Sequence, residues 1–128
     1  MQQLIAHLVG DYILQSHDMA TKKTTSSFWT FYHAITYTLP FLFLTQNLIA
    51  LGIICITHFF IDRFRLARYL VKFKNVLFGD VVTADKDEYN TPTGYPKETP
   101  AWLSTWLLII ADNTLHLLIN FIVLFYAN

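Results

Sequence analysis

The chain has 128 residues, of which 54% are hydrophobic and 14% are charged, and its formal net charge is zero. A soluble domain averages about 25% charged residues. The low charge content, with a mean hydropathy of +0.38, therefore favours a lipid bilayer over water as the solvent of this chain. The length suits one domain, and the zero net charge argues against nucleic acid as a partner.

Four apolar segments alternate with polar connectors, and each segment is long enough to be a helix. Pro40 lies inside the second segment and is expected to kink it. The third segment continues into a stretch of alternating basic and apolar residues, which is typical of an amphipathic extension at the headgroups. The expected helices cover residues 2–17, 27–44, 48–74 and 101–126. The sequence thus predicts an all-α fold, a single domain over residues 1–128 formed by four antiparallel transmembrane helices.

The basic residues indicate how such a bundle is oriented. No Lys or Arg lies between residues 24 and 62, and none follows Lys97. By the positive-inside rule, the first and third connectors face the cytoplasm and both termini lie outside. The third connector, residues 75–100, is long and polar, and it is expected to be either a lid over a site or a solvated connector.

Histidine and aspartate recur four residues apart in three of the four segments, and the remaining segment contributes a further histidine. Residues four apart share one face of a helix, so each pair can point at a common centre. The seven residues are His7, Asp11, His33, His58, Asp62, Asp112 and His116. Because all seven can reach similar depths in the bundle, we expect them to form one polar site.

A carboxylate at the centre of a bilayer costs about 3 kcal/mol or more, so these aspartates need partners. Imidazole together with carboxylate suits Zn, Mn or Fe(II), and seven candidate ligands suffice for one or two ions. Asp11, Asp62 and Asp112 are the candidate catalytic carboxylates. The alternative is a hydrogen-bonded network that only holds the helices together.

Other polar residues lie close to this pattern. Gln15 and Asn113 are candidates to orient a metal ligand through hydrogen bonds. Basic side chains at the end of the third apolar run are candidates to contact anionic headgroups or a phosphorylated substrate. They are Arg63, Arg65 and Arg68.

Five stretches of the chain resemble a family of small bacterial and phage integral membrane proteins, catalogued as domain of unknown function 3307. The stretches are residues 7–15, 33–34, 57–62 and 112–116, and residues 93–96 followed by Trp102-Leu103. The resemblance covers nearly the whole chain and implies a location in the bacterial inner membrane. A looser similarity, to membrane-bound metal-dependent hydrolases with His-x-x-x-Asp pairs, implies hydrolysis by analogy.

These observations predict a membrane-embedded metal-dependent hydrolase that acts on a lipid or a phosphate-bearing molecule at the cytoplasmic face. One alternative is a non-enzymatic phage or bacterial factor, which binds a host membrane protein and uses its polar core for structure alone. Another is a small ion- or proton-coupled carrier. A soluble bundle with a buried di-metal site is a fourth interpretation. Membrane lipids are expected partners, and a homo-oligomer is compatible with each interpretation.

Overall fold

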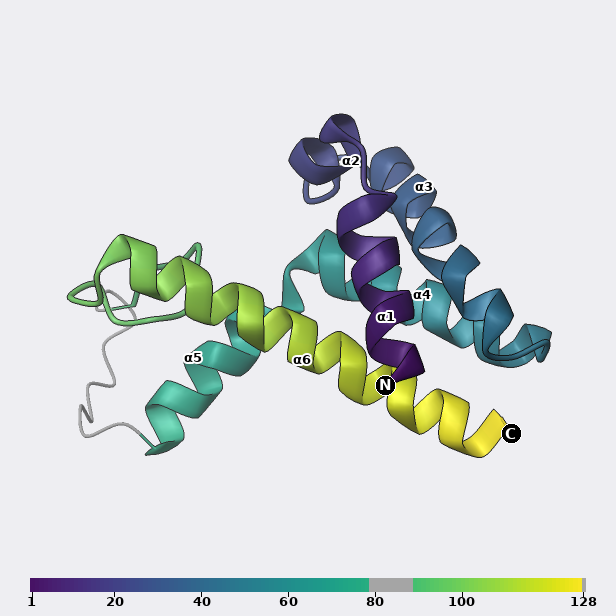
Figure 1. The fold of residues 1–128 in the computed structure, drawn as a ribbon. Coiled ribbons are helices and arrows are strands. Elements are labelled where there is room, and N and C mark those ends of the chain that lie inside the picture. Colours follow the sequence, from purple (N-terminus) through teal and green to yellow (C-terminus); the bar gives the residue numbers. More distant parts are fainter. Residues whose placement is uncertain (79–88, 128) are drawn as a thin grey trace. The chain divides into compact units, whose positions relative to one another are not determined.

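The protein is seen in a computed structural model that describes residues 1–78 and 89–127 (Figure 1). These residues are mostly helical. No β-strand occurs among them, and one isolated bridge joins Tyr89 to Pro96. The helices are α1 (Gln2–Leu8), η1 (Val9–Ile13), α2 (His17–Lys22), α3 (Ser27–Thr38), η2 (Leu39–Phe43), α4 (Leu48–Phe64), α5 (Leu66–Phe78) and α6 (Ala101–Ala127). The predicted all-α class is confirmed.

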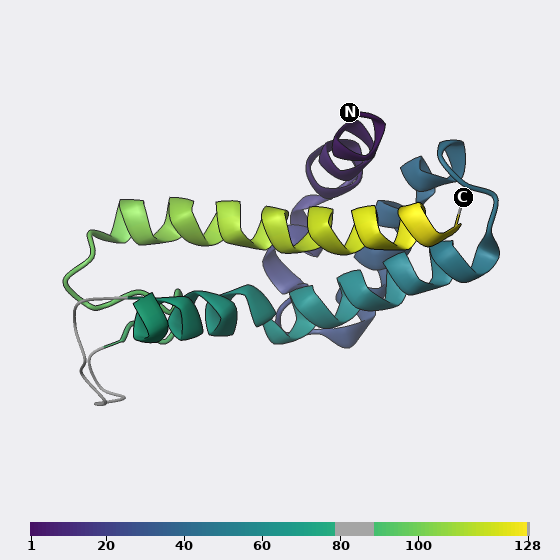
Figure 2. The same cartoon turned by 90° about the horizontal axis from the view of Figure 1, so that it is seen from below.

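Contacts along the chain define two compact units. The first contains Met1–Phe64 and His116–Asn128, and the second contains Arg65–Leu115. The boundary between the units falls within the long, continuous helix α6 (Figure 2). Its residues before His116 belong to the second unit, and His116 and the residues after it belong to the first. The prediction of one domain over residues 1–128 did not include this division.

The apolar core of the first unit lies where α1, η2 and α4 meet α3. It consists of Ala6, Tyr37, Phe41, Leu51 and Ile54. Two residues from the end of α6, Val123 and Leu124, pack against these side chains. Close packing of these side chains stabilises the contacts between the elements through many small dispersion interactions. This core therefore packs α1, α3 and α4, three of the elements that carry the polar residues described below, against one another.

The first predicted helix, over residues 2–17, ends earlier than expected and changes form on the way. After α1 the chain opens into the single π-helical turn η1, in which the amide of Leu14 donates to the carbonyl oxygen of Val9 at 2.9 Å. Gly10 lets this turn lie directly against α3, because a Cβ here would be 2.7 Å from the backbone oxygen of Tyr37. His17 then begins a separate short helix, α2, with Ser16 as its N-cap.

The second and third predicted helices are each divided. Pro40 lies at the start of η2, where the α-helix of the second segment tightens into a 3₁₀-helix, as a proline within a helix favours. The helix expected over residues 48–74 ends at Phe64, and a new helix begins at Leu66. Arg65, between them, has a φ of 52°, a left-handed conformation that an α-helix cannot contain. The continuous third helix was therefore wrong.

The second unit contains α5, the first part of α6 and an ordered loop after residue 88. In this loop the amide of Asn90 donates to the carbonyl oxygen of Tyr95 at 2.7 Å. Gly94, with a φ of 77°, closes the turn. The lid or connector expected over residues 75–100 falls partly on residues 79–88, which lie outside the described residues. Of the remainder, residues 75–78 complete α5, and residues 89–100 contain a turn in which Thr93 is buried. The choice between a lid and a solvated connector stays a prediction.

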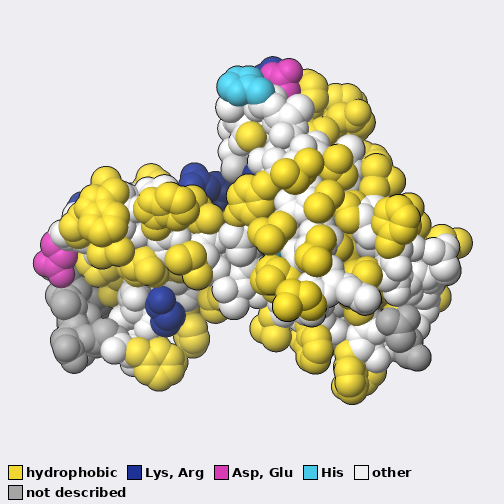
Figure 3. All heavy atoms as spheres, in the orientation of Figure 1, with side chains coloured by type: hydrophobic (Ala, Val, Ile, Leu, Met, Phe, Trp, Pro, Cys, Tyr) yellow, Lys and Arg dark blue, Asp and Glu magenta, His cyan; other side chains and the backbone are white. Residues whose placement is uncertain are grey.

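The first unit buries polar side chains and exposes apolar ones. His7 and His33 are completely buried, whereas Phe28, Ile49 and Phe125 are 68%, 76% and 68% exposed. Figure 3 shows hydrophobic side chains across the visible face of the molecule. Among the described residues, α6 is the one helix that is long and apolar enough to cross a membrane.

Candidate metal centre

Six of the seven predicted histidines and aspartates come together inside the first unit. Four helical elements supply them: α1 with η1, α3, α4 and the last part of α6. They are His7, Asp11, His33, His58, Asp62 and His116, and all six are buried. The four-residue step of a helix explains the pairing on α4, where His58 Nε2 lies 3.3 Å from Asp62 Oδ2.

The Nε2 atom of His33 lies at the centre of this cluster. It is 3.1 Å from Asp11 Oδ1 and 3.0 Å from His58 Nε2. Asp62 Oδ2 follows at 3.4 Å. The other ring nitrogen of His33, Nδ1, is buried and has no hydrogen-bond partner among the described residues. The ring of His33 is therefore oriented by contacts at Nε2.

The π-helical turn explains how Asp11 reaches this centre. A π-turn is wider than an α-turn and is often found where a helix presents a functional side chain. Here His7 and Asp11 are four residues apart, but His7 Nε2 and Asp11 Oδ2 are separated by 3.9 Å. Asp11 Oδ1 instead faces α3 and contacts His33. The sequence pattern paired Asp11 with His7, and the structure pairs it more closely with His33.

A second layer of polar contacts lies behind His58, around the ring of Tyr37. This ring stacks on that of His58, with ring centroids 3.6 Å apart. The Tyr37 hydroxyl contacts His7 Nδ1 at 2.9 Å and accepts a hydrogen bond from Asn120 Nδ2 at 2.6 Å. His58 Nδ1 also lies 3.2 Å from His116 Nδ1. Each histidine is thus held in place by a neighbour.

Lys23 is a member of the site that the sequence patterns did not single out. Its Nζ lies 2.9 Å from Asp62 Oδ2 and 3.7 Å from Asp11 Oδ1, and its side chain is 18% exposed. One ammonium thus bridges two carboxylates. With neutral histidines the cluster carries one net negative charge, which favours the entry of a proton or a cation.

The spacing of four atoms fits the ligands of one metal ion. Four ligands about 2.0–2.2 Å from a zinc ion in a tetrahedron lie about 3.3–3.6 Å from one another. The His33 and His58 Nε2 atoms and one oxygen each of Asp11 and Asp62 are separated by 3.0–4.0 Å along their measured edges. Two imidazoles and two carboxylates also form a donor set that Zn, Mn and Fe(II) accept. The residues therefore fit a divalent metal.

Comparison with known proteins gives one match. The family model described as "Protein of unknown function (DUF3307)" covers residues 1–127. The chain belongs to the DUF3307 family. No curated protein and no solved structure matches it. Family membership therefore agrees with the resemblance seen in the sequence and adds no activity to it.

The structure also places the remaining predicted residues of this DUF3307 chain. Gln15 contacts the centre, with its Nε2 atom 3.1 Å from His33 Nε2. Asp112 and Asn113 belong to the second unit, in the helical turn of α6 that precedes His116, and both are half-buried. His17, which begins α2, is exposed and outside the cluster.

The three predicted headgroup-binding arginines have different surroundings. Arg63 donates from its Nη1 to the carbonyl oxygen of Thr24 at 2.7 Å, so it fixes the connector between α2 and α3. Arg65 donates to the carbonyl oxygen of Pro92 at 3.0 Å within the second unit. Arg68 lines a small pocket of that unit.

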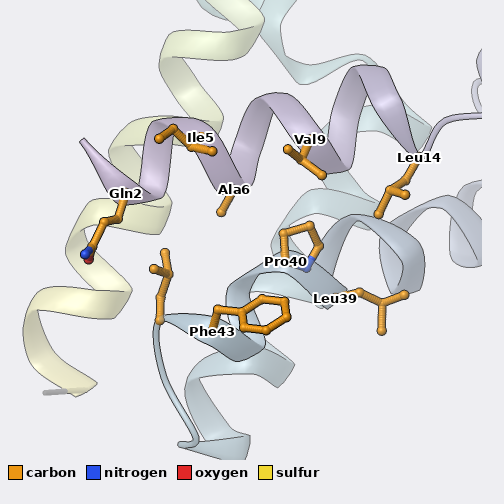
Figure 4. Close-up of a pocket in the computed structure, with 9 residues that line it drawn as sticks. Gln2, Ile5, Ala6, Val9, Leu14, Leu39, Pro40 and Phe43 are labelled. Carbon is orange, nitrogen blue, oxygen red and sulfur yellow. The ribbon is translucent and has the colours of Figure 1, made fainter.

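An apolar groove of about 550 Å³ lies on another face of the first unit. Figure 4 shows α1 and η1 along one side of it and η2 along the other, with Ile5, Val9 and Phe43 among the labelled residues. The helix that carries His7 and Asp11 to the cluster thus presents its apolar face to this groove.

Two members of the site were visible in the sequence but carried no prediction. Tyr37 lies four residues after His33, and Asn120 lies four residues after His116, so the same step that relates the histidines relates these residues to them. Lys23 had no such signal, because it lies in a connector and reaches the site only through the fold of α2.

Proposed function

We propose that this protein is a membrane-embedded metal-dependent hydrolase that acts on a lipid or phosphate-bearing molecule at the cytoplasmic face. The observation that supports it is the convergence of His33, His58, Asp11 and Asp62 at distances suited to one ion. Separate observations support a location in the membrane, a bound metal ion and the class of substrate.

The distribution of side chains, with polar ones buried and apolar ones exposed, supports a location in the membrane. Buried imidazoles and carboxylates beneath exposed Phe and Ile side chains are stable when the solvent is hydrocarbon. The helix α6 has 27 residues, or about 40 Å, enough to span a bilayer core of about 30 Å. We propose that α3 with η2, and α4, accompany it as spans, and that α1 with η1 enters as a shorter fourth segment. The basic connectors would face the cytoplasm of a bacterial cell and both termini the outside.

The donor set supports Zn, Mn or Fe(II) at the centre. Such an ion supplies Lewis acidity and lowers the pKa of a bound water. The two histidines and two aspartates would hold it, and Tyr37 would fix His7 and His58 from behind. Gln15 contacts His33 at Nε2, the atom that would bind the ion, so it would not orient this ligand through its other ring nitrogen as predicted. His116, 3.5 Å from Asp62 Oδ1, is available for a second ion or for proton transfer.

Two features support the substrate class. Lys23 is a partly exposed member of the site and lies beside both carboxylates, where its ammonium can meet a phosphate. The apolar groove beside η2 is of a kind that accommodates an acyl chain. A lipid with an anionic headgroup combines both requirements.

The metal content of the purified protein tests the proposal. The full chain is purified in an uncharged detergent, equilibrated with Zn, Mn or Fe(II), dialysed and analysed by elemental mass spectrometry. We expect about one ion per chain in the wild type, and loss of at least nine tenths of it in a variant carrying His58→Ala and Asp62→Ala. Hydrolysis of phospholipid or phosphomonoester probes should be lost in the same variant.

The matched control carries His17→Ala and Asp18→Ala, which remove one histidine and one aspartate from α2 outside the cluster. This variant should keep its metal and its activity. Wild-type protein that retains no ion above the level of the cluster variant contradicts the proposal.

A purely structural polar core is the second candidate, and the Lys23 contact favours it. Because one ammonium already bridges Asp11 and Asp62, half of the carboxylate charge of the cluster is neutralised without a metal. In that case the protein is a non-enzymatic membrane factor, such as a phage or bacterial protein that binds a host membrane partner. Folded His58→Asn protein would then keep its biological effect, whereas the hydrolase would lose it.

A further inference from the structure

A small basic pocket occupies the second unit, between α5 and the ordered loop. Its volume is about 150 Å³, the space of a few water molecules or one phosphate group. Arg68 and Lys72 of α5 form one wall, and Asn90 and Thr91 of the loop form the other. Hydrogen-bond donors and positive charge therefore surround one concave space.

The loop is fixed tightly against α5, so the pocket is formed in advance. Gly94 approaches the helix closely: a Cβ at this position would lie 2.2 Å from the backbone oxygen of Arg68. Asn75 Nδ2 donates to the Gly94 carbonyl oxygen at 3.4 Å, and Lys74 Nζ donates to the Tyr95 hydroxyl at 3.3 Å. These contacts hold the second wall in place from the next turn of α5.

The two basic residues of the pocket are held by aromatic rings. The Arg68 guanidinium lies 4.7 Å from the centroid of the Tyr69 ring, and Lys72 Nζ lies 5.3 Å from that of Tyr89. Within the described part of the chain, neither side chain forms an ion pair with a carboxylate. Arg68 Nε is buried with no hydrogen-bond acceptor among those residues. A buried guanidinium N–H without a partner is costly and favours an anion.

We propose that this pocket binds a phosphate group, with Arg68 and Lys72 supplying the charge and Asn90 and Thr91 supplying further hydrogen bonds. Arginine and lysine together suit phosphate, because the planar guanidinium donates two parallel hydrogen bonds and the ammonium acts as a point charge. The group belongs either to the headgroup of an anionic lipid or to a soluble phosphate compound.

The exposed face of α5 makes a lipid headgroup the expected source. Apolar residues recur along it at steps of three and four, and they are Leu66, Tyr69, Leu70, Phe73 and Leu77, all exposed. A helix with an apolar stripe beside basic residues is typical of a membrane interface, where the stripe enters the acyl region and the basic residues meet the headgroups. This proposal is independent of the metal centre.

Binding of two probes to the full chain in uncharged detergent tests the pocket. The probes are inorganic phosphate and a short-chain phosphatidic acid, with short-chain phosphatidylcholine as the reference, and calorimetry measures their affinities. Each basic residue near an anionic surface contributes roughly a factor of five to affinity, so Arg68→Gln with Lys72→Gln should weaken phosphatidic acid binding about thirtyfold. Lys22→Gln with Lys97→Gln removes two charges outside the pocket and should leave the affinity within about twofold.

Asn90→Ala with Thr91→Ala provides a second variant that keeps the charge. It should weaken binding of the same probe, which a general electrostatic attraction to the protein would not predict. If only phosphatidic acid binds, and both pocket variants weaken its binding, the pocket is a site for a lipid headgroup. If inorganic phosphate binds and both pocket variants weaken its binding, the pocket is a site for a soluble phosphate compound. The proposal is overturned if neither probe binds better than phosphatidylcholine, or if the pocket variants and the control lose affinity equally.

Discussion

Lys23 determines the charge balance of the cluster, although it stands outside every histidine–aspartate pair. Asp11 and Asp62 are almost completely buried, and among the described residues Lys23 is the lysine or arginine whose charge lies within 4 Å of both. An unpaired buried carboxylate is strongly destabilising. The stability of the protein without metal should therefore depend on this one side chain.

Lys23→Met removes the charge and keeps most of the side-chain volume. In the presence of a chelator we expect a loss of about 3 kcal/mol in the free energy of unfolding, because two buried carboxylates lose their counter-charge. Saturating Zn or Mn should recover most of this loss, since the ion takes over the neutralisation. Denaturation of the detergent-solubilised protein, with and without metal, measures both effects.

Lys22→Met is the matched control for this substitution. Lys22 donates to Asp18 Oδ1 at 2.6 Å on the surface of α2, and this hydrogen bond lowers the pKa of Asp18. Because water screens an exposed pair of this kind, its loss should change the free energy of unfolding little. Equal losses in the two variants, or no effect of metal on Lys23→Met, would show that Lys23 does not balance the cluster.

The part of the site that could be predicted is the part set by helix periodicity. His58 and Asp62 are adjacent because four residues make about one turn, and this holds whatever the rest of the chain does. Lys23 could not be predicted, since its position depends on how the connector folds back over Asp62. The pairing of Asp11 with His33 could not be predicted either, because it depends on a change from α-helix to π-helix at Val9 that no residue pattern indicates.

At the scale of elements, the contact between η1 and α3 carries Asp11 into the site. This contact requires a residue without a side chain at position 10, where an added Cβ would meet Tyr37 Cδ2 at 2.9 Å as well as the Tyr37 backbone. Tyr37 is itself fully buried and stacked on His58, so it has little room to move. Displacement of η1 is therefore the expected response to any side chain there.

Gly10→Ala should lower the free energy of unfolding by about 1–3 kcal/mol through overpacking, and it should weaken metal binding because Asp11 moves away from His33. Gly52→Ala, in the interior of α4, is the control: nothing lies within 4 Å of its added Cβ. That substitution should be neutral or stabilising by up to about 1 kcal/mol. Denaturation and metal titration of both variants provide the comparison. Equal changes in stability and in metal affinity in the two variants would show that η1 is not closely packed against α3 at Gly10.

The existence of the helices was predictable from hydropathy, whereas their ends were not. Pro40 predicted a break in the second helix because it lacks an amide hydrogen, and the 3₁₀-helix η2 begins beside it. Arg65 gave no sign in the sequence that a helix ends there, because arginine is an ordinary helix former. Its left-handed conformation comes from its surroundings, including the contact with Pro92. Long-range contacts of this kind are absent from any local pattern.

At the scale of the whole molecule, the distribution of charge leads to a topology that can be measured. With Cys55→Ser as the parent, single cysteines are placed at Thr21, in the basic first connector, and at Gln46, in the uncharged turn before α4. Both positions are exposed. We expect a membrane-impermeant maleimide to label Gln46→Cys in intact cells and Thr21→Cys only after permeabilisation, as the positive-inside rule requires.

The opposite labelling pattern would place the basic connectors outside and overturn the proposed orientation. Labelling of both positions in intact cells, or recovery of the protein in the soluble fraction, would contradict the spanning arrangement itself. The result also decides on which side of the membrane a substrate must be supplied in any activity assay.

The π-helical turn has a consequence for how the chain tolerates change in length. Such a turn is equivalent to an α-helix that contains one additional residue, so a deletion just before Asp11 would allow α1 to continue in regular register. The shortened helix would have regular backbone geometry, and the side chains after the turn would keep their directions, because the turn had already absorbed the additional residue. Asp11 lies inside the turn, so the deletion would move it by one residue step, about 100° around the axis. Asp11 would then point away from His33, and the proposed ion site would lose one of its four ligands while the helix became more regular.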